Sequence, residues 1–65
     1  AVFPNPIDNR LYVRSEGLSS VIVYNAHGQQ IISLESDGSS VLDTTEWPNG
    51  VYFVSVDGEV TKVIK

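Results

Sequence analysis

Residues 51–64 read VYFVSVDGEVTKVI, and this stretch decides the fold class. Two apolar runs flank Asp57-Gly58, a pair of residues that both adopt positive φ readily. Both runs are rich in β-branched and aromatic residues, which favour strands. We therefore predict a tight two-residue hairpin with strands over residues 51–56 and 60–64.

The same rhythm of short apolar runs continues through the rest of the chain. Gly, Asn, Asp and Ser interrupt the runs at intervals of about ten residues, a spacing typical of an all-β sandwich or barrel. The other expected strands contain Val2-Phe3, Leu11-Tyr12-Val13, Val21-Ile22-Val23-Tyr24, Ile31-Ile32-Ser33-Leu34 and Val41-Leu42. We therefore expect an all-β fold, a small immunoglobulin-like antiparallel β-sandwich of about seven strands.

Turn residues separate these runs. Asn25-Ala26-His27-Gly28 and Asn49-Gly50, the latter entered through Pro48, each place a glycine where left-handed backbone is expected. Asp43-Thr44-Thr45-Glu46 could begin one helical turn, but Pro48 prevents its continuation. We interpret this segment as a crossover loop.

Alternation along the strands predicts which side chains meet. The even-numbered residues of the 51–56 run share one face and the odd-numbered residues share the other. Together with the Leu and Val pairs of the earlier runs, this pattern predicts a core closed by Tyr52 and Trp47. Tyr12, Tyr24 and Phe53 fall on second faces. They form either core closure at the ends or an exposed aromatic patch, and the pattern fits both.

The composition restricts the classes of function. The chain has 65 residues, so we expect one domain over residues 1–65. Its net charge of −4 argues against a nucleic-acid surface and disfavours binding to anionic lipid. It has no cysteine, and no apolar run approaches the roughly 20 residues of a membrane-spanning helix. We expect a soluble piece of a longer protein, since the chain starts at Ala1 without a methionine and without a signal-peptide pattern.

No arrangement of residues indicates catalysis, a metal or another cofactor. His27, the single histidine, lies in a predicted turn, and the serines match no nucleophile pattern. The aspartates lack the alternating acidic spacing of a calcium loop and are interpreted as turn formers. These are Asp8, Asp37, Asp43 and Asp57.

Four aromatic residues leave carbohydrate binding open. Trp47 with Tyr12, Tyr24 and Tyr52 could form a platform on which sugars stack. Core closure by Trp47 is the simpler interpretation, because a lone tryptophan usually completes the interior of a small domain.

The chain opens with Phe3-Pro4-Asn5-Pro6, whose prolines fix two φ angles and provide no N–H to a sheet. We interpret the segment as a rigid entry that holds Val2-Phe3 against a sheet edge in one register. The prolines also protect an edge strand from aggregation.

Taken together, these motifs resemble a known family. The chain resembles the type IX, or Por, secretion system C-terminal sorting domain of Bacteroidota. The resemblance rests on the order of five motifs, which are Phe3-Pro4-Asn5-Pro6, Leu11-Tyr12-Val13, Val21-x-Val23-Tyr24-Asn25-x-x-Gly28, Trp47-Pro48-Asn49-Gly50-Val51-Tyr52-Phe53-Val54 and Lys62-Val63-Ile64-Lys65. Two positions depart from the family pattern. Trp47 stands where leucine is usual, and Gln29 stands where a basic residue often follows the glycine.

The resemblance implies a transport address with no catalytic residue. A cargo protein N-terminal to the domain would cross the periplasm and leave through an outer-membrane translocon. A cell-surface sortase would then commonly remove the domain, leaving cargo on the surface or outside the cell. The last four residues, Lys62, Val63, Ile64 and Lys65, are the predicted translocon handle, because an exposed strand end with two lysines suits strand addition or charge pairing. The other motif residues have mainly structural roles, and they are Phe3, Pro4, Asn5, Pro6, Leu11, Tyr24, Asn25, Gly28, Pro48, Gly50 and Tyr52.

Two other functions stay open at this point. A carbohydrate-binding domain requires Trp47 and the tyrosines to be exposed, whereas an inert immunoglobulin-like spacer requires the last four residues to affect only stability. Pairing of edge strands into a homodimer also stays open.

Overall fold

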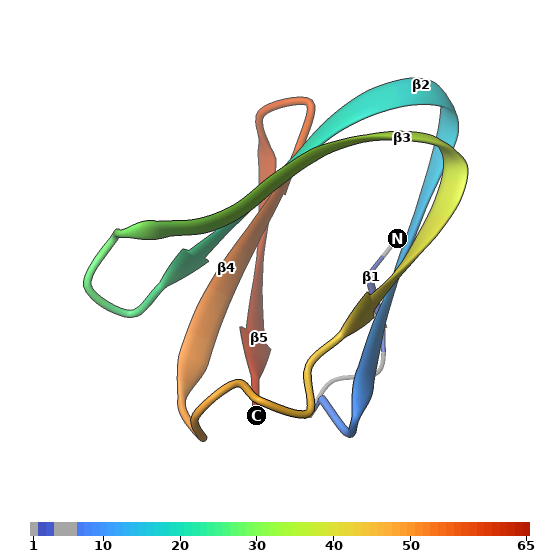
Figure 1. Ribbon diagram of the computed structural model, residues 1–65. Helices are drawn as coiled ribbons and strands as arrows, with labels where there is room; N and C mark the ends of the chain where they lie inside the picture. The colour runs from blue at the N-terminus through green and yellow to red at the C-terminus, as the bar shows by residue number, and fades with distance from the viewer. Residues whose placement is uncertain (1, 4–6) are drawn as a thin grey trace.

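The computed structural model describes residues 2–3 and 7–65, and this part of the chain consists of strands and turns without a helix (Figure 1). The strands are β1 (Val2–Phe3), β2 (Arg10–Asn25), β3 (Gln30–Asp43), β4 (Val51–Val56) and β5 (Glu59–Ile64). All their pairings are antiparallel. The all-β prediction is confirmed, and so is the hairpin at Asp57-Gly58, whose φ angles are 51° and 87°.

The expected number of about seven strands is wrong, because two pairs of predicted strands are continuous. The runs at residues 11–13 and 21–24 both belong to β2, and those at residues 31–34 and 41–42 both belong to β3. The serine-rich segments between them look like loops in the sequence. In the structure they stay extended, and Ser19 and Ser36 are buried in the strands.

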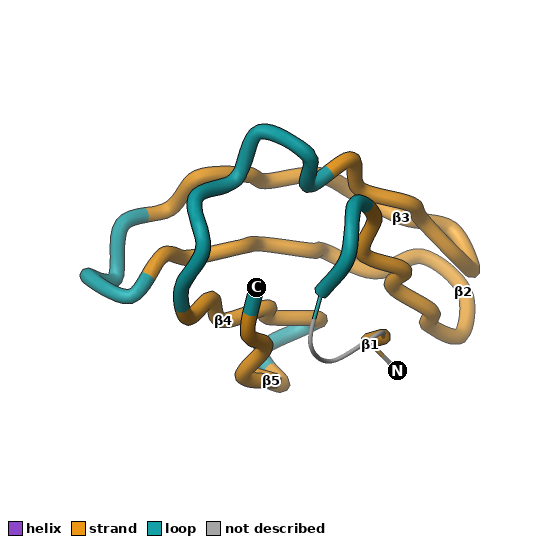
Figure 2. The backbone as a smooth tube through the Cα atoms, turned by 90° about the horizontal axis from the view of Figure 1, so that it is seen from below, coloured by secondary structure: helices purple, strands orange, loops and turns teal. Residues whose placement is uncertain are grey.

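One sheet replaces the two sheets of the expected immunoglobulin-like sandwich. β3 lies along one edge of β2, while β1 and β4 pair with the other edge at different places along its length. The β2–β3 ribbon bends where the register shifts between Arg14 and Leu18, and Gly17 there has a φ of +68°. The bend brings β1 opposite β4 and β5 (Figures 1 and 2), so a single folded sheet encloses the core.

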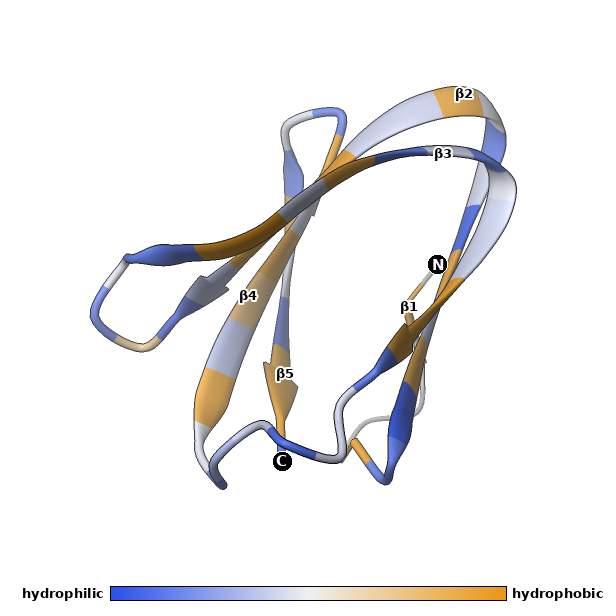
Figure 3. Ribbon diagram, viewed as in Figure 1, coloured by the Kyte–Doolittle hydropathy of each residue, from blue (hydrophilic) through white to orange (hydrophobic). Residues whose placement is uncertain are grey.

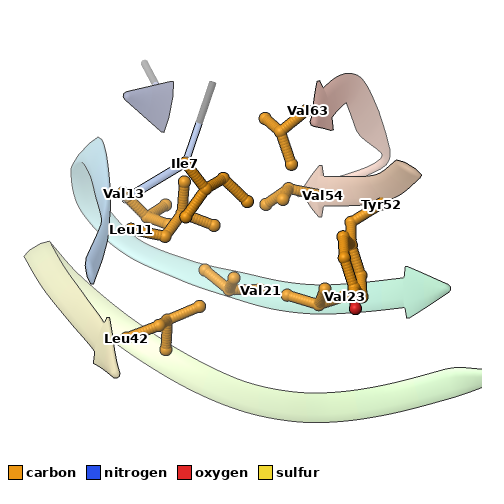
Figure 4. Close-up of a cluster of buried hydrophobic side chains, with 9 residues drawn as sticks. All are labelled: Ile7, Leu11, Val13, Val21, Val23, Leu42, Tyr52, Val54 and Val63. Atoms are coloured by element: carbon orange, nitrogen blue, oxygen red, sulfur yellow. The ribbon is translucent and has the colours of Figure 1, made fainter. Parts of the chain in front are cut away.

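The core comprises the inward side chains of both halves of the folded sheet (Figure 4). Leu11 and Val13 come from the first half of β2, and Val21 and Val23 come from its second half. The predicted closure is confirmed, because Tyr52 is buried and Trp47 packs against the cluster. The full buried set is Ile7, Leu11, Val13, Val21, Val23, Leu42, Tyr52, Val54 and Val63.

Strongly hydrophilic residues lie mainly in the turns, whereas the bend of the β2–β3 ribbon is mixed and largely of intermediate hydropathy (Figure 3). In the β4–β5 turn, Asp57 exchanges two hydrogen bonds with Ser20 of β2: its N–H donates to the Ser20 carbonyl at 3.0 Å and its Oδ1 accepts from the Ser20 N–H at 2.9 Å. The hairpin is therefore fixed to the central strand at its tip as well as along its length.

Candidate functional site

The four residues predicted as the translocon handle lie on and just after β5, but they face different environments. Phe53 pairs with Lys62 and Tyr52 pairs with Val63 in the β4–β5 register. Val63 is fully buried in the core, whereas Ile64 is 46% exposed and Lys62 is exposed. A partner that docks on the folded domain therefore meets Lys62 and Ile64, and does not meet Val63.

Lys65 turns back onto the crossover loop. Its Nζ donates to the carbonyl of Thr44, and also to the carbonyls of Thr45 at 3.2 Å and Trp47 at 2.8 Å. Its backbone exchanges hydrogen bonds of 2.8 and 2.9 Å with Gly50. The side chain and backbone of this half-buried lysine thus join the end of β5 to the segment that precedes β4.

Thr44 fixes the other side of that loop. It is fully buried, its hydroxyl donates to the Asp8 carbonyl at 2.8 Å, and its N–H donates to the Asn9 carbonyl at 2.9 Å. The Trp47 N–H donates to the Thr44 carbonyl at 3.0 Å and closes a turn. The predicted crossover loop is therefore confirmed and is held at both ends.

Asp43 starts this turn as a side-chain acceptor. Its Oδ1 accepts the Thr45 hydroxyl at 2.6 Å and the Thr45 N–H at 3.0 Å. These two hydrogen bonds, together with the more distant charges of Arg10 and Lys65, hold the pKa of Asp43 below its ordinary value of 3.8. Asp43 is thus a turn former, as the sequence predicts.

The outward side chains of β2, β4 and β5 form a mostly apolar surface, which we call the Phe53 face. Because Val23, Val54 and Val63 point into the core, their neighbours along the strands point away from it. Phe53 lies between Tyr24 of β2 and Lys62 of β5 in the register of the sheet. Val60 is 58% exposed, while Tyr24 and Phe53 are half-buried. The face consists of Ile22, Tyr24, Val51, Phe53, Ser55, Val60, Lys62 and Ile64, of which Ser55 is buried between Ile22 and Val60.

Charge is unevenly distributed around the Phe53 face. Lys62 is its only basic residue among the described positions, because Arg10 and Arg14 lie on the first half of β2 and Lys65 turns into the loop. The acidic residues lie elsewhere, at turns, at the bend, or on β3 and the inward side of β5. The face therefore carries one basic residue, Lys62, among mostly apolar side chains on a chain of net charge −4.

The predicted structural motif residues separate into core and turn positions. Leu11 is core, and Asn25 closes the β2–β3 turn by accepting the N–H groups of His27 and Gln29 on its Oδ1, both at 3.0 Å. Its Nδ2 donates to the Gln29 side chain at 2.9 Å, so the departure at Gln29 adds a neutral hydrogen bond to the turn. Gly28 has a φ of +82° there.

The remaining motif residues lie near the crossover loop or at the chain start. The Pro48 carbonyl accepts the Tyr52 hydroxyl at 2.5 Å, and Gly50 pairs with Lys65. Phe3 lies on β1. The predictions for Pro4, Asn5 and Pro6 fall outside the described residues.

The four aromatic residues proposed as a sugar platform are not on one surface. Tyr52 is buried, and its ring centroid lies 4.9 Å from that of Trp47, which packs on the core. Tyr12 is on the first half of β2 and Tyr24 is on the Phe53 face. Trp47 and Tyr52 do line a cleft of about 460 Å³ between the β2–β3 turn and the crossover loop.

Two features of the site were missed from the sequence. The alternation of Val60, Lys62 and Ile64 on β5 matches that of Val51 and Phe53 on β4, so the Phe53 face could have been found from the hairpin alone. The carbonyl oxygens that bind Lys65 have no sequence signal, because every residue carries one.

A metal site requires clustered ligand side chains, and a membrane-spanning segment of the helical kind requires a long apolar helix. Within residues 2–3 and 7–65, no group of three or more His, Cys, Asp or Glu side chains is placed to hold a metal ion. Over the same residues no helix has the length and apolar character to cross a membrane.

Comparison with known proteins identifies one family. The family model described as the secretion system C-terminal sorting domain matches residues 1–65, which is the full sequence given. No curated protein and no solved structure matches the chain.

Proposed function

The chain belongs to the secretion system C-terminal sorting domain family and is a sorting signal for type IX secretion, and we propose that the secretion machinery recognises it through the Phe53 face. Lys62 and Ile64, two residues of the predicted handle, lie on this face. The family assignment implies a cargo N-terminal to the domain and export to the cell surface or outside.

The single observation that carries the proposal is the exposure of apolar side chains around Lys62. Val60 and Ile64 are 58% and 46% exposed, although a chain of this size has few apolar residues to spare from its core. A contiguous apolar surface on a small soluble domain usually marks a binding site. The partner that fits it is a protein surface with apolar side chains and a carboxylate opposite Lys62.

The later steps of transport are part of the same proposal. The cargo passes through the periplasm, the outer-membrane translocon binds the domain, and a sortase removes the domain at the cell surface. Removal requires cleavage N-terminal to the folded sheet, so we place the junction between cargo and domain before β1, which already pairs with β2.

The test is export of a fluorescent reporter with this chain fused to its C-terminus in a bacterium that has a type IX system. Val60→Asp and Lys62→Glu are expected to lower export about tenfold each, since either places a negative charge against the partner's apolar and acidic surface. Val41→Asp is the matched control, because Val41 is 57% exposed but lies on β3 away from the Phe53 face.

Circular dichroism of the three variants must first show that they are folded. Export of Val41→Asp should stay within about twofold of the unchanged chain. Equal export of all folded variants would contradict recognition through the Phe53 face, while the family assignment would stand.

A further inference from the structure

We propose that the crossover loop is a binding site for a primary ammonium group, and that Lys65 is its ligand within the chain. The site consists of the backbone carbonyl oxygens of Thr44, Thr45 and Trp47. It gives the last lysine a role inside the domain, which differs from the recognition role proposed for Lys62.

The Lys65 ammonium and the crossover loop match in the number and kind of their hydrogen-bonding groups. A lysine ammonium has three N–H donors and no acceptor, and three carbonyl oxygens accept from Lys65. Hydrogen bonds from an ionised donor are stronger than those between neutral groups. The site therefore selects R–NH₃⁺ over a cation that has no N–H.

The loop conformation makes the carbonyls converge. Thr44 is buried and is fixed to Asp8 and Asn9, and the Trp47 N–H returns to the Thr44 carbonyl. All the oxygens that bind Lys65 are backbone atoms, so no side-chain oxygen of Thr45 or Glu46 is among its acceptors.

The bound ammonium positions the last strand. The Ile7 N–H donates to the Ile64 carbonyl at 2.6 Å, and the backbone of Lys65 pairs with Gly50. With the side chain added, Lys65 joins the end of β5 to the loop that carries Trp47 over Tyr52. Because β5 also carries Lys62 and Ile64, Lys65 acts as a positioning residue for the Phe53 face.

This arrangement separates the tasks of the two lysines. The Lys62 side chain points outward from the sheet, whereas the Lys65 ammonium is bound by the loop. A partner that paired with Lys65 would first have to displace three hydrogen bonds. We therefore assign Lys65 to docking of the strand and Lys62 to the surface.

Site-specific chemistry tests the ammonium directly, because the chain has no native cysteine. Lys65→Cys is alkylated under denaturing conditions to give three side chains and is then refolded. Bromoethylamine restores a primary ammonium, (2-bromoethyl)trimethylammonium gives the charge without N–H donors, and iodoacetamide gives a neutral amide. The same three products at Lys62→Cys are the matched controls.

Thermal unfolding and the emission of Trp47, the single tryptophan, are the measurements. The primary ammonium should bring Tm to within about 2 °C of the unchanged chain, and the other two products should unfold about 5–10 °C lower with red-shifted emission. The three products at position 62 should differ less in Tm than the three at position 65, because the Lys62 side chain is exposed.

The proposal is overturned if the trimethylammonium product matches the primary ammonium at position 65, or if the primary ammonium fails to restore Tm. A second measurement uses the unchanged chain. Nitrogen-15 NMR should detect one ammonium protected from exchange with water, and the signal should persist in Lys62→Met. Absence of a protected signal from Lys65 would contradict the site. None of these measurements involves the secretion machinery, so their outcome is independent of recognition through the Phe53 face.

Discussion

Asn25 closes the β2–β3 turn with a side chain that accepts two backbone N–H groups, so the motif Tyr24-Asn25-x-x-Gly28 is explained by turn geometry. Short polar side chains that bond to nearby backbone are readable from sequence, because donor and acceptor are only a few residues apart. Asp43 belongs to the same class, because it accepts the N–H of Thr45 two residues later, whereas Asp57 accepts the N–H of Ser20, 37 residues earlier. The destination of the Lys65 side chain is not readable in this way, since its acceptors lie 18 to 21 residues earlier in the chain.

Asp43 leads to a prediction about pH at the scale of one residue. Its pKa is lower in the folded chain than its ordinary value of 3.8, so its carboxylate stabilises the fold at higher pH. This contribution is fully present above the ordinary value and is lost as the pH falls through the lowered one. Thr45→Val removes the hydroxyl donor, so the pKa of Asp43 should rise, as measured by carboxyl NMR titration. The variant should have a slightly lower Tm than the unchanged chain at pH 7, and the difference in Tm should shrink as the pH falls below 3.8. An unchanged pKa of Asp43 in Thr45→Val would show that the hydroxyl does not set it.

At the scale of elements, the β2–β3 ribbon is the part of the fold that the sequence predicted least well. Apolar periodicity located its four runs, but Ser36 and Ser40 between two of them bond to each other within β3, with 2.6 Å between their hydroxyl oxygens. Serine is common both in loops and at strand edges, so composition could not decide whether the chain stopped or continued. The β4–β5 hairpin was predictable because Asp57-Gly58 specifies one turn geometry.

The bend in the ribbon provides the prediction at this scale. Gly17 has a φ of +68°, and a Cβ added there would meet no atom within 4 Å, so any penalty for substitution comes from the backbone. Gly17→Ala should destabilise the chain by about 1 kcal/mol, and Gly17→Asn by less than half as much, because asparagine tolerates left-handed backbone better. Urea unfolding followed by circular dichroism measures both. Equal losses for alanine and asparagine would mean that the φ angle does not limit substitution at the bend.

At the scale of the whole molecule, three distant segments meet at the end of the sheet where β5 stops (Figure 2). Ile7 donates to Ile64, Thr44 donates to Asp8 and Asn9, and Lys65 joins Gly50 and the crossover loop. Alternation predicted core members such as Val21 and Val54, but Val63, which is fully buried, was expected in the translocon handle. The sequence could not predict this closure, because hydrogen bonds between backbone groups far apart in the chain leave no pattern in residue types.

The closure predicts that the chain depends on its last four residues for stability. A chain that ends at Thr61 loses the fully buried Val63, the Ile64 partner of Ile7 and the ammonium of Lys65. A domain of this size has a free energy of unfolding of only about 3–10 kcal/mol, and loss of a core side chain and its strand pairing removes most of it. The truncated chain should therefore be largely unfolded at 37 °C by circular dichroism, whereas Lys62→Glu should keep a cooperative transition. A truncated chain with an unchanged urea midpoint would show that β5 adds little to the fold. If the expected unfolding is observed, loss of export on truncation reports loss of folding, and only outward substitutions such as Lys62→Glu and Val60→Asp can report which surface the secretion machinery recognises.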